Sequence, residues 1–170
     1  PLVLYPKEGL SLINGTQVST AIAIKALIDG SNLLKIADVT GAFSVENSFS
    51  SKEVFQKNIH ELKLHPGQLV SARNVFNMLK GSEIVKSHKS HRKIQDPYSF
   101  RCIPHIHGAC RDSFANALQM VNNEINSVSD NPLILFDGNI VNSGHFHAEH
   151  IAQSMDQLSI SFTELGAISE

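Results

Sequence analysis

A polar, turn-prone run of eight residues lies between two longer segments whose apolar patterns predict helices: Gln95-Asp96-Pro97-Tyr98-Ser99-Phe100-Arg101-Cys102. Pro97 has a fixed φ and favours an extended residue before it, so we predict a loop here rather than an unbroken α-helix. In that loop Gln95 offers an amide, Tyr98 a phenol, and Arg101 a guanidinium that can hold a carboxylate through two parallel hydrogen bonds. The combination suits a small anionic ligand. The alternative is an ordinary loop whose polar side chains tie helix ends together.

Helices are predicted on both sides of this run. Residues 17–47 mix apolar and small side chains nearly all round, which is typical of a helix buried on most faces. Thr16 is expected to cap this helix through its hydroxyl, and Gly30 and Gly41 mark the points where it is expected to kink or break most easily. After the run, Pro104 suits the first turn of a helix that we expect to reach residue 127.

Two further helices are predicted over residues 68–79 and 147–165, from apolar residues that recur every three or four positions. Residues 81–94 are rich in Lys and His and predict a solvated connector. Asp137-Gly138 lies between two short apolar runs, which is typical of a β-hairpin. We therefore predict one all-α domain over residues 1–170, a bundle of long helices with a small irregular or hairpin segment near 133–145.

Composition limits the classes of partner and location. The formal net charge is -2 and 42% of the residues are hydrophobic, so the chain has no basic footprint for nucleic acid or for an acidic membrane surface. No apolar run reaches the roughly 18 residues of a membrane-spanning helix, and the first residues do not resemble a signal peptide. Cys102 and Cys110 do not form a disulfide framework. We expect a cytoplasmic protein with reduced thiols, and neither a nucleic acid nor a membrane as its partner.

The run at 95–102 also resembles the Q-D-x-Y-S-x-R-C signature of the histidine and aromatic amino acid ammonia-lyases. Four further segments match motifs of that family in the family's order: GLSLINGTQ at 9–17, HPGQ at 65–68, NSVSDNPL at 126–133 and SGHFH at 143–147. One short motif is weak support, but five in order cover nearly the whole chain. The resemblance is closest to the histidine-specific members, chiefly through residues 14–17 and 98–102.

The resemblance implies the long-helix fold of the fumarase and aspartase superfamily and assembly into a homotetramer. It implies non-oxidative deamination of L-histidine to urocanate and ammonia, with an amino acid as the small-molecule partner. The family activates its substrate with a 4-methylidene-imidazol-5-one group that forms from its own Ala-Ser-Gly. These 170 residues contain no Ala-Ser-Gly, and the resemblance places that segment before Pro1. We therefore expect a central fragment with a partial active site, inactive and self-associating when alone.

Five residues take roles from the resemblance. Asn14 would hydrogen-bond the electrophile or the substrate, and Gln95 and Tyr98 would line and order the pocket. Arg101 would hold the substrate carboxylate, and Phe146 would pack beside the substrate ring. In the family, each pocket draws these segments from different subunits. No metal is expected.

Two neighbouring positions depart from the family pattern: His105 stands where Gln is common, and His145 stands where Asn is common. Other interpretations stay open. One is a different aromatic amino acid ammonia-lyase or an aminomutase, and another is a non-catalytic protein that keeps the scaffold. A third is a zinc site, because thiolates and imidazoles bind zinc and recur here at short spacings, although unlike those of common zinc modules: Cys102, His105, His107, Cys110, His145, His147 and His150.

Overall fold

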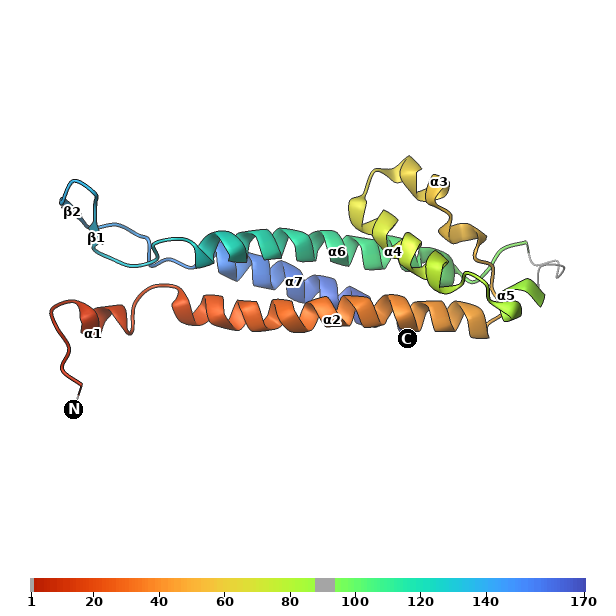
Figure 1. The fold of residues 1–170 in the computed structure, drawn as a ribbon, viewed down its shortest axis with the longest axis horizontal. Coiled ribbons are helices and arrows are strands. Elements are labelled where there is room, and N and C mark those ends of the chain that lie inside the picture. The colour runs from red at the N-terminus through yellow and green to blue at the C-terminus, as the bar shows by residue number, and fades with distance from the viewer. Residues whose placement is uncertain (1, 88–93) are drawn as a thin grey trace.

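The computed structural model describes residues 2–87 and 94–170 of the chain. Four long helices form an elongated bundle (Figure 1): α2 (Gln17–Asn47), α4 (Pro66–Met78), α6 (Tyr98–Ile125) and α7 (Glu149–Ala167). Shorter elements lie at the ends and along one side: α1 (Glu8–Ser11), η1 (Glu53–Phe55), α3 (Lys57–His60), η2 (Glu61–Lys63), α5 (Glu83–Ser87), β1 (Leu133–Ile134) and β2 (Ile140–Val141). The predicted all-α class and the small hairpin are confirmed.

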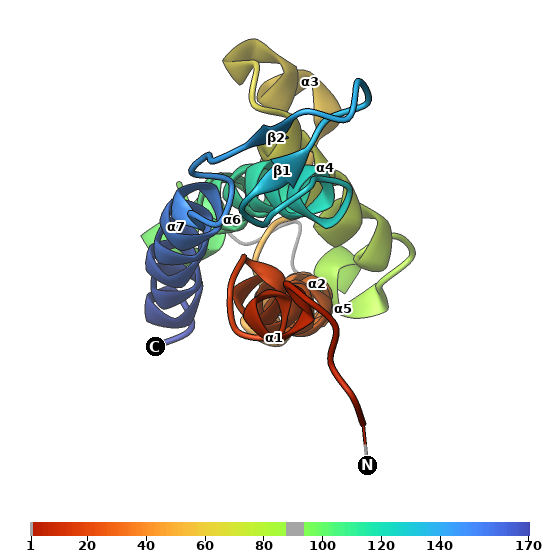
Figure 2. The same ribbon diagram turned by 90° about the vertical axis from the view of Figure 1, so that its left-hand side faces the viewer.

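Helix α6 is the centre of the bundle and packs against α2, α4 and α7. Viewed from the end (Figure 2), α2, α4 and α7 lie around it. One apolar cluster joins α2, α4 and α6 with η1 and α5: Ala42, Val45, Phe55, Val75, Leu79, Val85 and Ile103. Two others join α2, α6 and α7: Ala23, Leu27, Ala117, Val121, Ile151 and Leu158 in one, and Leu34, Cys110 and Leu165 in the other. The long helices therefore share one continuous set of contacts.

Three glycines in the long helices, Gly30, Gly67 and Gly108, mark close approaches between helices. Helix α2 runs from Gln17 to Asn47 through Gly30 and Gly41, so neither glycine breaks it. A Cβ atom at Gly30 would lie 2.5 Å from Cζ of Phe162 on α7. Gly67 on α4 and Gly108 on α6 face each other so closely that a Cβ atom on either would overlap the backbone of the opposite helix. Here glycine is needed for packing, which outweighs its low helix propensity.

The predicted start of α6 at Pro104 is wrong. The helix begins at Tyr98, with Pro97 as its N-terminal cap at φ -49° and ψ 146°, and Pro104 lies buried inside it. The predicted loop is therefore limited to residues before Tyr98. Proline inside a helix removes one backbone hydrogen bond and strains the preceding turn. Burial of Pro104 and its neighbour Ile103 against the core offsets that cost.

Two smaller expectations also need correction. Residues 83–87 form α5 with Val85 buried, so the predicted connector is partly helical, while residues 88–93 lie outside the described part of the chain. The hydroxyl of Thr16 does not cap α2; it hydrogen-bonds the Glu124 carboxylate on α6 at 2.6 Å. The apolar stripe of α7 packs within the chain, with Ile151, Leu158 and Leu165 buried.

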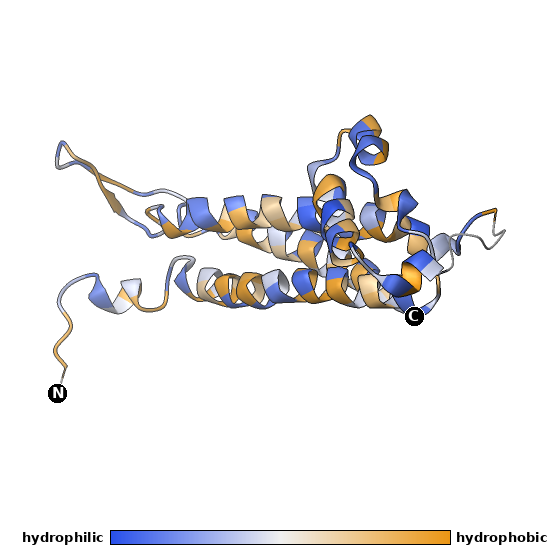
Figure 3. Cartoon of the chain, turned by 45° about the vertical axis from the view of Figure 1, so that its right-hand side comes forward, coloured by the Kyte–Doolittle hydropathy of each residue, from blue (hydrophilic) through white to orange (hydrophobic). Residues whose placement is uncertain are grey.

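Helix α2 is not buried on most faces in this chain. Figure 3 shows apolar positions along its whole length, and several are exposed: Val18, Ile22, Ile28, Leu33, Ile36 and Phe43. Leu118 and Ile125 on α6 are also about half exposed, at 49% and 53%. Among the described residues, no helix combines the length and apolar character needed to cross a membrane.

Candidate functional site

The first group of predicted site residues lies where α6 begins, and we call Gln95, Tyr98 and Arg101 the α6-start patch. Gln95 is exposed, and the side chain of Tyr98 lies on the surface, with the residue 73% exposed. Arg101 is half-buried because its Nε donates a hydrogen bond to the backbone oxygen of Asp96 at 2.9 Å. Within the described residues, its two terminal nitrogens have no protein partner. They are free to hold a carboxylate.

Asp96 fixes the backbone that precedes α6. Its residue is 8% exposed, and its Oδ2 accepts a hydrogen bond from the backbone N–H of Ser51 at 2.8 Å. The loop is thereby tied to the segment after α2, and the same residue orients Arg101 through its carbonyl. The polar groups of the run therefore tie helix ends together. Its role in binding an anionic ligand stays a prediction.

The second group lies at the other end of the bundle, where α2 begins. Asn14 donates a hydrogen bond from Nδ2 to Oδ1 of Asp130 at 3.1 Å. Asp130 also accepts from Ser11 Oγ at 2.9 Å and from the ammonium of Lys7. We call Lys7, Ser11, Asn14 and Asp130 the Asp130 cluster. It joins two motif segments that are 116 residues apart in the sequence.

Asp130 is held as a carboxylate. The hydrogen bond from Lys7 lowers its pKa most, and the backbone N–H of Asn131 and the Ser11 hydroxyl lower it further. The N–H of Asn131 donates to Oδ1 at 2.7 Å, so each carboxylate oxygen accepts two hydrogen bonds. A carboxylate with this many donors stays charged well below neutral pH.

Phe146 lies near the same end, between β2 and α7, and is 42% exposed. Its neighbour His145 is exposed, and its Nδ1 lies 2.7 Å from Ser143 Oγ. Both precede α7, which starts beside the end of α6. Asn14 and Phe146 therefore belong to one end of the bundle, and the α6-start patch belongs to the other.

The chain does not bring all five predicted residues together. Helix α6 runs from Tyr98 to Ile125, 28 residues, which at 1.5 Å per residue is about 40 Å. Figure 1 shows α6 starting beside α5 and ending beside the hairpin, while α2 starts near the hairpin. One copy of the chain thus holds the predicted site residues in two separate groups, which we call the half-sites.

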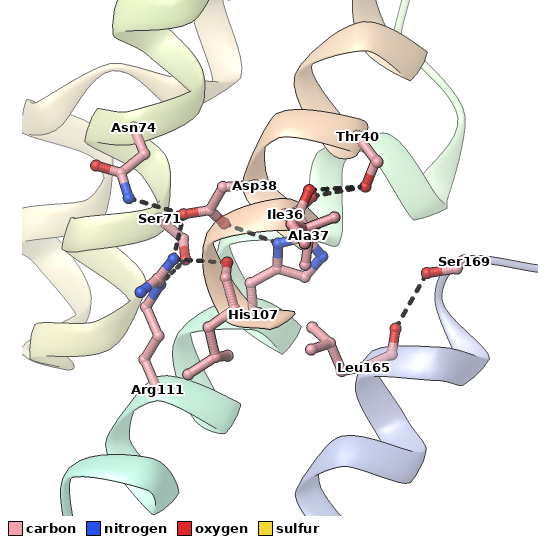
Figure 4. Close-up of polar contacts among 11 residues, drawn as sticks. Ile36, Ala37, Asp38, Thr40, Ser71, Asn74, His107, Arg111, Leu165 and Ser169 are labelled. Carbon is pink, nitrogen blue, oxygen red and sulfur yellow. Dashed lines mark hydrogen bonds and ion pairs between the residues drawn. The ribbon is translucent and has the colours of Figure 1, made fainter. Parts of the chain in front are cut away.

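A buried polar network, which the sequence analysis missed, joins α2, α4 and α6 (Figure 4). Asp38 on α2 is 1% exposed and accepts from His107 Nδ1 at 2.9 Å and from Arg111 Nη2 at 2.6 Å, both on α6. Asn74 on α4 donates to the same carboxylate at 2.8 Å. Because a carboxylate only accepts, Nδ1 of His107 carries the proton.

Arg111 extends the network to two more groups. Its Nη2 also donates to the backbone oxygen of Leu34 at 2.9 Å, and its Nε donates to Ser71 Oγ at 2.9 Å. Burial by itself would raise the pKa of Asp38, but the hydrogen bonds from His107 and Asn74 and the charge of Arg111 outweigh it and lower the pKa. The network is a charged clamp between α2, α4 and α6, remote from both half-sites.

The Cys and His residues of the zinc alternative point to different partners. His107 bonds Asp38, and the thiol of Cys110 donates to the backbone oxygen of Ser161 at 2.9 Å. Burial raises the pKa of Cys110 to about 11, which disfavours the thiolate that zinc needs. In the described ranges 2–87 and 94–170, no three His, Cys, Asp or Glu side chains are grouped to hold a metal ion.

His105, one of the departures from the family pattern, lies beside another histidine. Its ring centroid is 5.6 Å from that of His60. Burial lowers the pKa of His105, and the charges of Lys63 and His60 add to this effect. His60 is buried between the carbonyl oxygen of Val54, 2.9 Å from Nε2, and the amide of Gln68, 2.8 Å from Nδ1. The ring of His105 therefore packs beside His60, one helical turn after Arg101.

Comparison with known proteins identifies the family. The model of the aromatic amino acid lyase family matches residues 1–170. The chain belongs to that family. A curated relative, histidine ammonia-lyase of Streptococcus pyogenes serotype M18, is 46% identical to this lyase chain over 167 residues, which is 98% of the chain and 32% of the relative. The chain thus spans about a third of the length of the curated relatives it matches.

Solved structures agree with the fold of the lyase chain. It matches histidine ammonia-lyase from Trypanosoma cruzi with a TM-score of 0.87 and 33% identity, over 99% of this chain and 31% of that one. Tyrosine aminomutase from Streptomyces globisporus matches with a TM-score of 0.89 and 30% identity, over 99% of this chain and 36% of that one. The all-α fold of the aromatic lyases is confirmed. Because lyase and aminomutase share it, the fold alone does not select the reaction.

Proposed function

We propose that the chain is the central part of a histidine ammonia-lyase, which removes ammonia from L-histidine to give urocanate. The sequence identity to histidine ammonia-lyase over nearly the whole chain is the main support. The placement of the site residues adds to it. Arg101 has two free terminal nitrogens at one end of the bundle, and Asn14 has a fixed amide at the other.

The pocket in this proposal is shared between copies of the chain. Two half-sites about 40 Å apart on one rigid bundle cannot close around one amino acid, so each pocket combines the α6-start patch of one copy with the Asn14 end of another. The exposed apolar residues of α2 support such an assembly, because large exposed apolar patches mark protein interfaces. A homotetramer is the expected form.

Each residue then has one task. The guanidinium of Arg101 binds the substrate carboxylate, and Tyr98 and Gln95 order the same end of the substrate. Phe146 packs beside the substrate ring, and Asn14 hydrogen-bonds the amino end. These assignments follow from matching the family motifs to this sequence. Gln95, Tyr98 and Phe146 are exposed in this chain, as expected for residues whose pocket is completed by a neighbouring copy.

The electrophile of the family, 4-methylidene-imidazol-5-one, would come from an Ala-Ser-Gly outside these 170 residues. When present, it activates the amino acid for loss of its amine. Asn14 and Gln95 are the residues here that would hold it, and both are amides able to donate and accept hydrogen bonds. Asn14 fits this task, because the Asp130 cluster fixes its amide, and the amide oxygen has no partner in the described part of the chain. The cytoplasm is the proposed location, supported by two free thiols.

Replacing Arg101 with Ala in the complete enzyme is expected to weaken kcat/KM for L-histidine by about 2 kcal/mol, roughly 30-fold, the scale of a charge-assisted hydrogen bond. Steady-state kinetics would measure it. Arg73→Ala, at an exposed arginine on α4, is the matched control and is expected to leave kcat/KM unchanged. Equal values for Arg101→Ala and the unaltered enzyme would refute the carboxylate role.

A substrate panel tests the choice of amino acid. We expect the complete enzyme to release ammonia from L-histidine with a higher kcat/KM than from L-tyrosine or L-phenylalanine, followed by ultraviolet absorbance of the product. A β-amino acid product, detected by chromatography, would instead assign the chain to an aminomutase. Loss of activity towards all three amino acids would favour a non-catalytic protein.

A further inference from the structure

Among the described residues, Asp130 is the side chain that hydrogen-bonds the Asn14 amide, through Oδ1 at 3.1 Å. We propose that Asp130 is a positioning residue that sets the orientation of the Asn14 amide in the active site. The proposal rests on the function proposed above, in which Asn14 hydrogen-bonds the electrophile or the substrate. The resemblance gave a role to Asn14 and none to Asp130.

The chemistry of the contact decides which way the amide faces. The nitrogen and oxygen of an Asn side chain are nearly identical in shape, so the hydrogen-bond partner determines the orientation. A carboxylate only accepts, so Nδ2 of Asn14 must face Asp130 Oδ1, 3.1 Å away. The amide oxygen faces away and, within the described residues, has no partner. It remains available to accept a hydrogen bond from an N–H group such as the substrate amine.

Asp130 is itself fixed in place. Its Oδ2 accepts from Lys7 and from Ser11 Oγ, and its Oδ1 accepts from Asn14 and from the backbone N–H of Asn131. One oxygen therefore anchors the carboxylate to α1 and the segment before it, and the other holds the Asn14 amide. Lys7 has a positive φ of 71°, a backbone conformation that is rare for non-glycine residues.

The arrangement predicts what an isosteric change does. In Asp130→Asn the new side chain has one oxygen and one NH2 group. Lys7 is a cation and only donates, so it retains the oxygen. The NH2 group then faces Asn14 and also the backbone N–H of Asn131, which loses its acceptor. Two NH2 groups cannot bond each other. The Asn14 amide must then rotate to offer its oxygen to residue 130, which removes that oxygen from the active site.

A double-mutant cycle in the complete enzyme tests the proposal. We expect Asp130→Asn to lower kcat for L-histidine by roughly 10- to 100-fold, the range for one hydrogen bond to a charged group, with KM changed much less. In the Asn14→Ala background the same change is expected to have no further effect on kcat. Asp137→Asn, at an exposed carboxylate in the hairpin turn that accepts hydrogen bonds from Asn139, is the matched control and should leave kcat unchanged.

The outcomes separate the two proposals. If Asn14→Ala lowers kcat but the loss from Asp130→Asn simply adds to it, Asp130 has only a structural role and the positioning proposal is overturned, while the proposed function stands. If Asn14→Ala retains full kcat, the role of Asn14 in the proposed function fails, and the positioning proposal fails with it. Unfolding curves of the same four proteins report the contact itself, where non-additive stabilities are expected.

A second variant covers the case in which Asp130→Asn does not fold. Lys7→Met removes only the cation on Oδ2 and leaves the Asp130–Asn14 hydrogen bond possible. We expect a smaller loss of kcat than in Asp130→Asn, and again none in the Asn14→Ala background. A loss that persists in that background would overturn the proposal.

Discussion

Replacing Asp38 with Ala is expected to lower the free energy of unfolding by about 3–5 kcal/mol, the cost of breaking a buried ion pair from one side. Asp38 is 1% exposed and accepts hydrogen bonds from α4 and α6. Its removal leaves the Arg111 guanidinium, whose side chain is 17% exposed, without its counter-charge. Urea denaturation followed by circular dichroism would measure the change.

Asp29→Ala is the matched control for this prediction. Asp29 lies on the same helix and pairs with Lys25 four residues earlier, but its side chain is 62% exposed. Exposed pairs contribute little, so the change should stay below about 1 kcal/mol. If Asp38→Ala cost no more than Asp29→Ala, the network would not clamp the three helices.

The lowered pKa of Asp38 gives the network a pH dependence with a definite sign. A carboxyl whose pKa is lower in the folded state stabilises the fold fully above its unfolded pKa, and this contribution is lost as the pH falls through the folded value. The ordinary value is 3.8 and the folded one lies below it. The stability difference between the unaltered protein and Asp38→Asn is therefore expected to be constant above pH 5 and to shrink below pH 3.8, in urea titrations at each pH.

Replacing Gly108 with Ala is expected to lower the free energy of unfolding by at least the 1–3 kcal/mol or so that overpacking usually costs. A Cβ atom at Gly108 would overlap the backbone of Gln68, and backbone cannot turn aside as a flexible side chain can. Helices α4 and α6 would have to separate. The hydrogen bond from the N–H of Gly67 to Asp112 Oδ1, 2.8 Å long, would be strained as well. Thermal and urea unfolding would measure the loss.

Gly166→Ala is the control within the same bundle. Gly166 lies inside α7, and a Cβ atom there would meet no other atom within 4 Å. Because Ala is favoured over Gly in a helix by up to about 1 kcal/mol, this variant should be neutral or slightly more stable. Equal effects at Gly108 and Gly166 would show that helix propensity, and not the close contact of α4 and α6, determines the result.

The helices themselves were largely predictable from the spacing of apolar residues. The stripe of Ile151, Leu158 and Leu165 predicted α7 and its buried face, and Asp137-Gly138 predicted the hairpin. The start of α6 was not predictable from Pro104, because proline suits a first turn and yet can be accommodated inside a helix when the core covers it. The faces of α2 were misjudged for a related reason: apolar residues predict burial but do not say which molecule supplies it.

The candidate site was predictable only through motifs. Composition and spacing indicated a polar run with Arg101, and the resemblance added Asn14 and Phe146. In the network at Asp38, the partners His107 and Arg111 follow Asp38 by 69 and 73 positions in the sequence. No local sequence pattern indicates a contact across such a separation. A signal was nevertheless present: Asp38 is the single acidic residue between Asp29 and Glu46 on α2, and His107 and Arg111 are four residues apart, on one helix face.

The unbroken path of α2 through Gly30 and Gly41 has a geometric consequence. Helices α2 and α6 run side by side between the α6-start patch and the Asn14 end. In the assembly proposed above, the length of the bundle would therefore fix the distance between neighbouring pockets. Inserting seven residues into α2 alone would lengthen that helix by about 10 Å while α6 kept its length. The bundle can become longer only if all its long helices lengthen together. We therefore expect insertions and deletions to occur in the loops and the helix lengths to be kept.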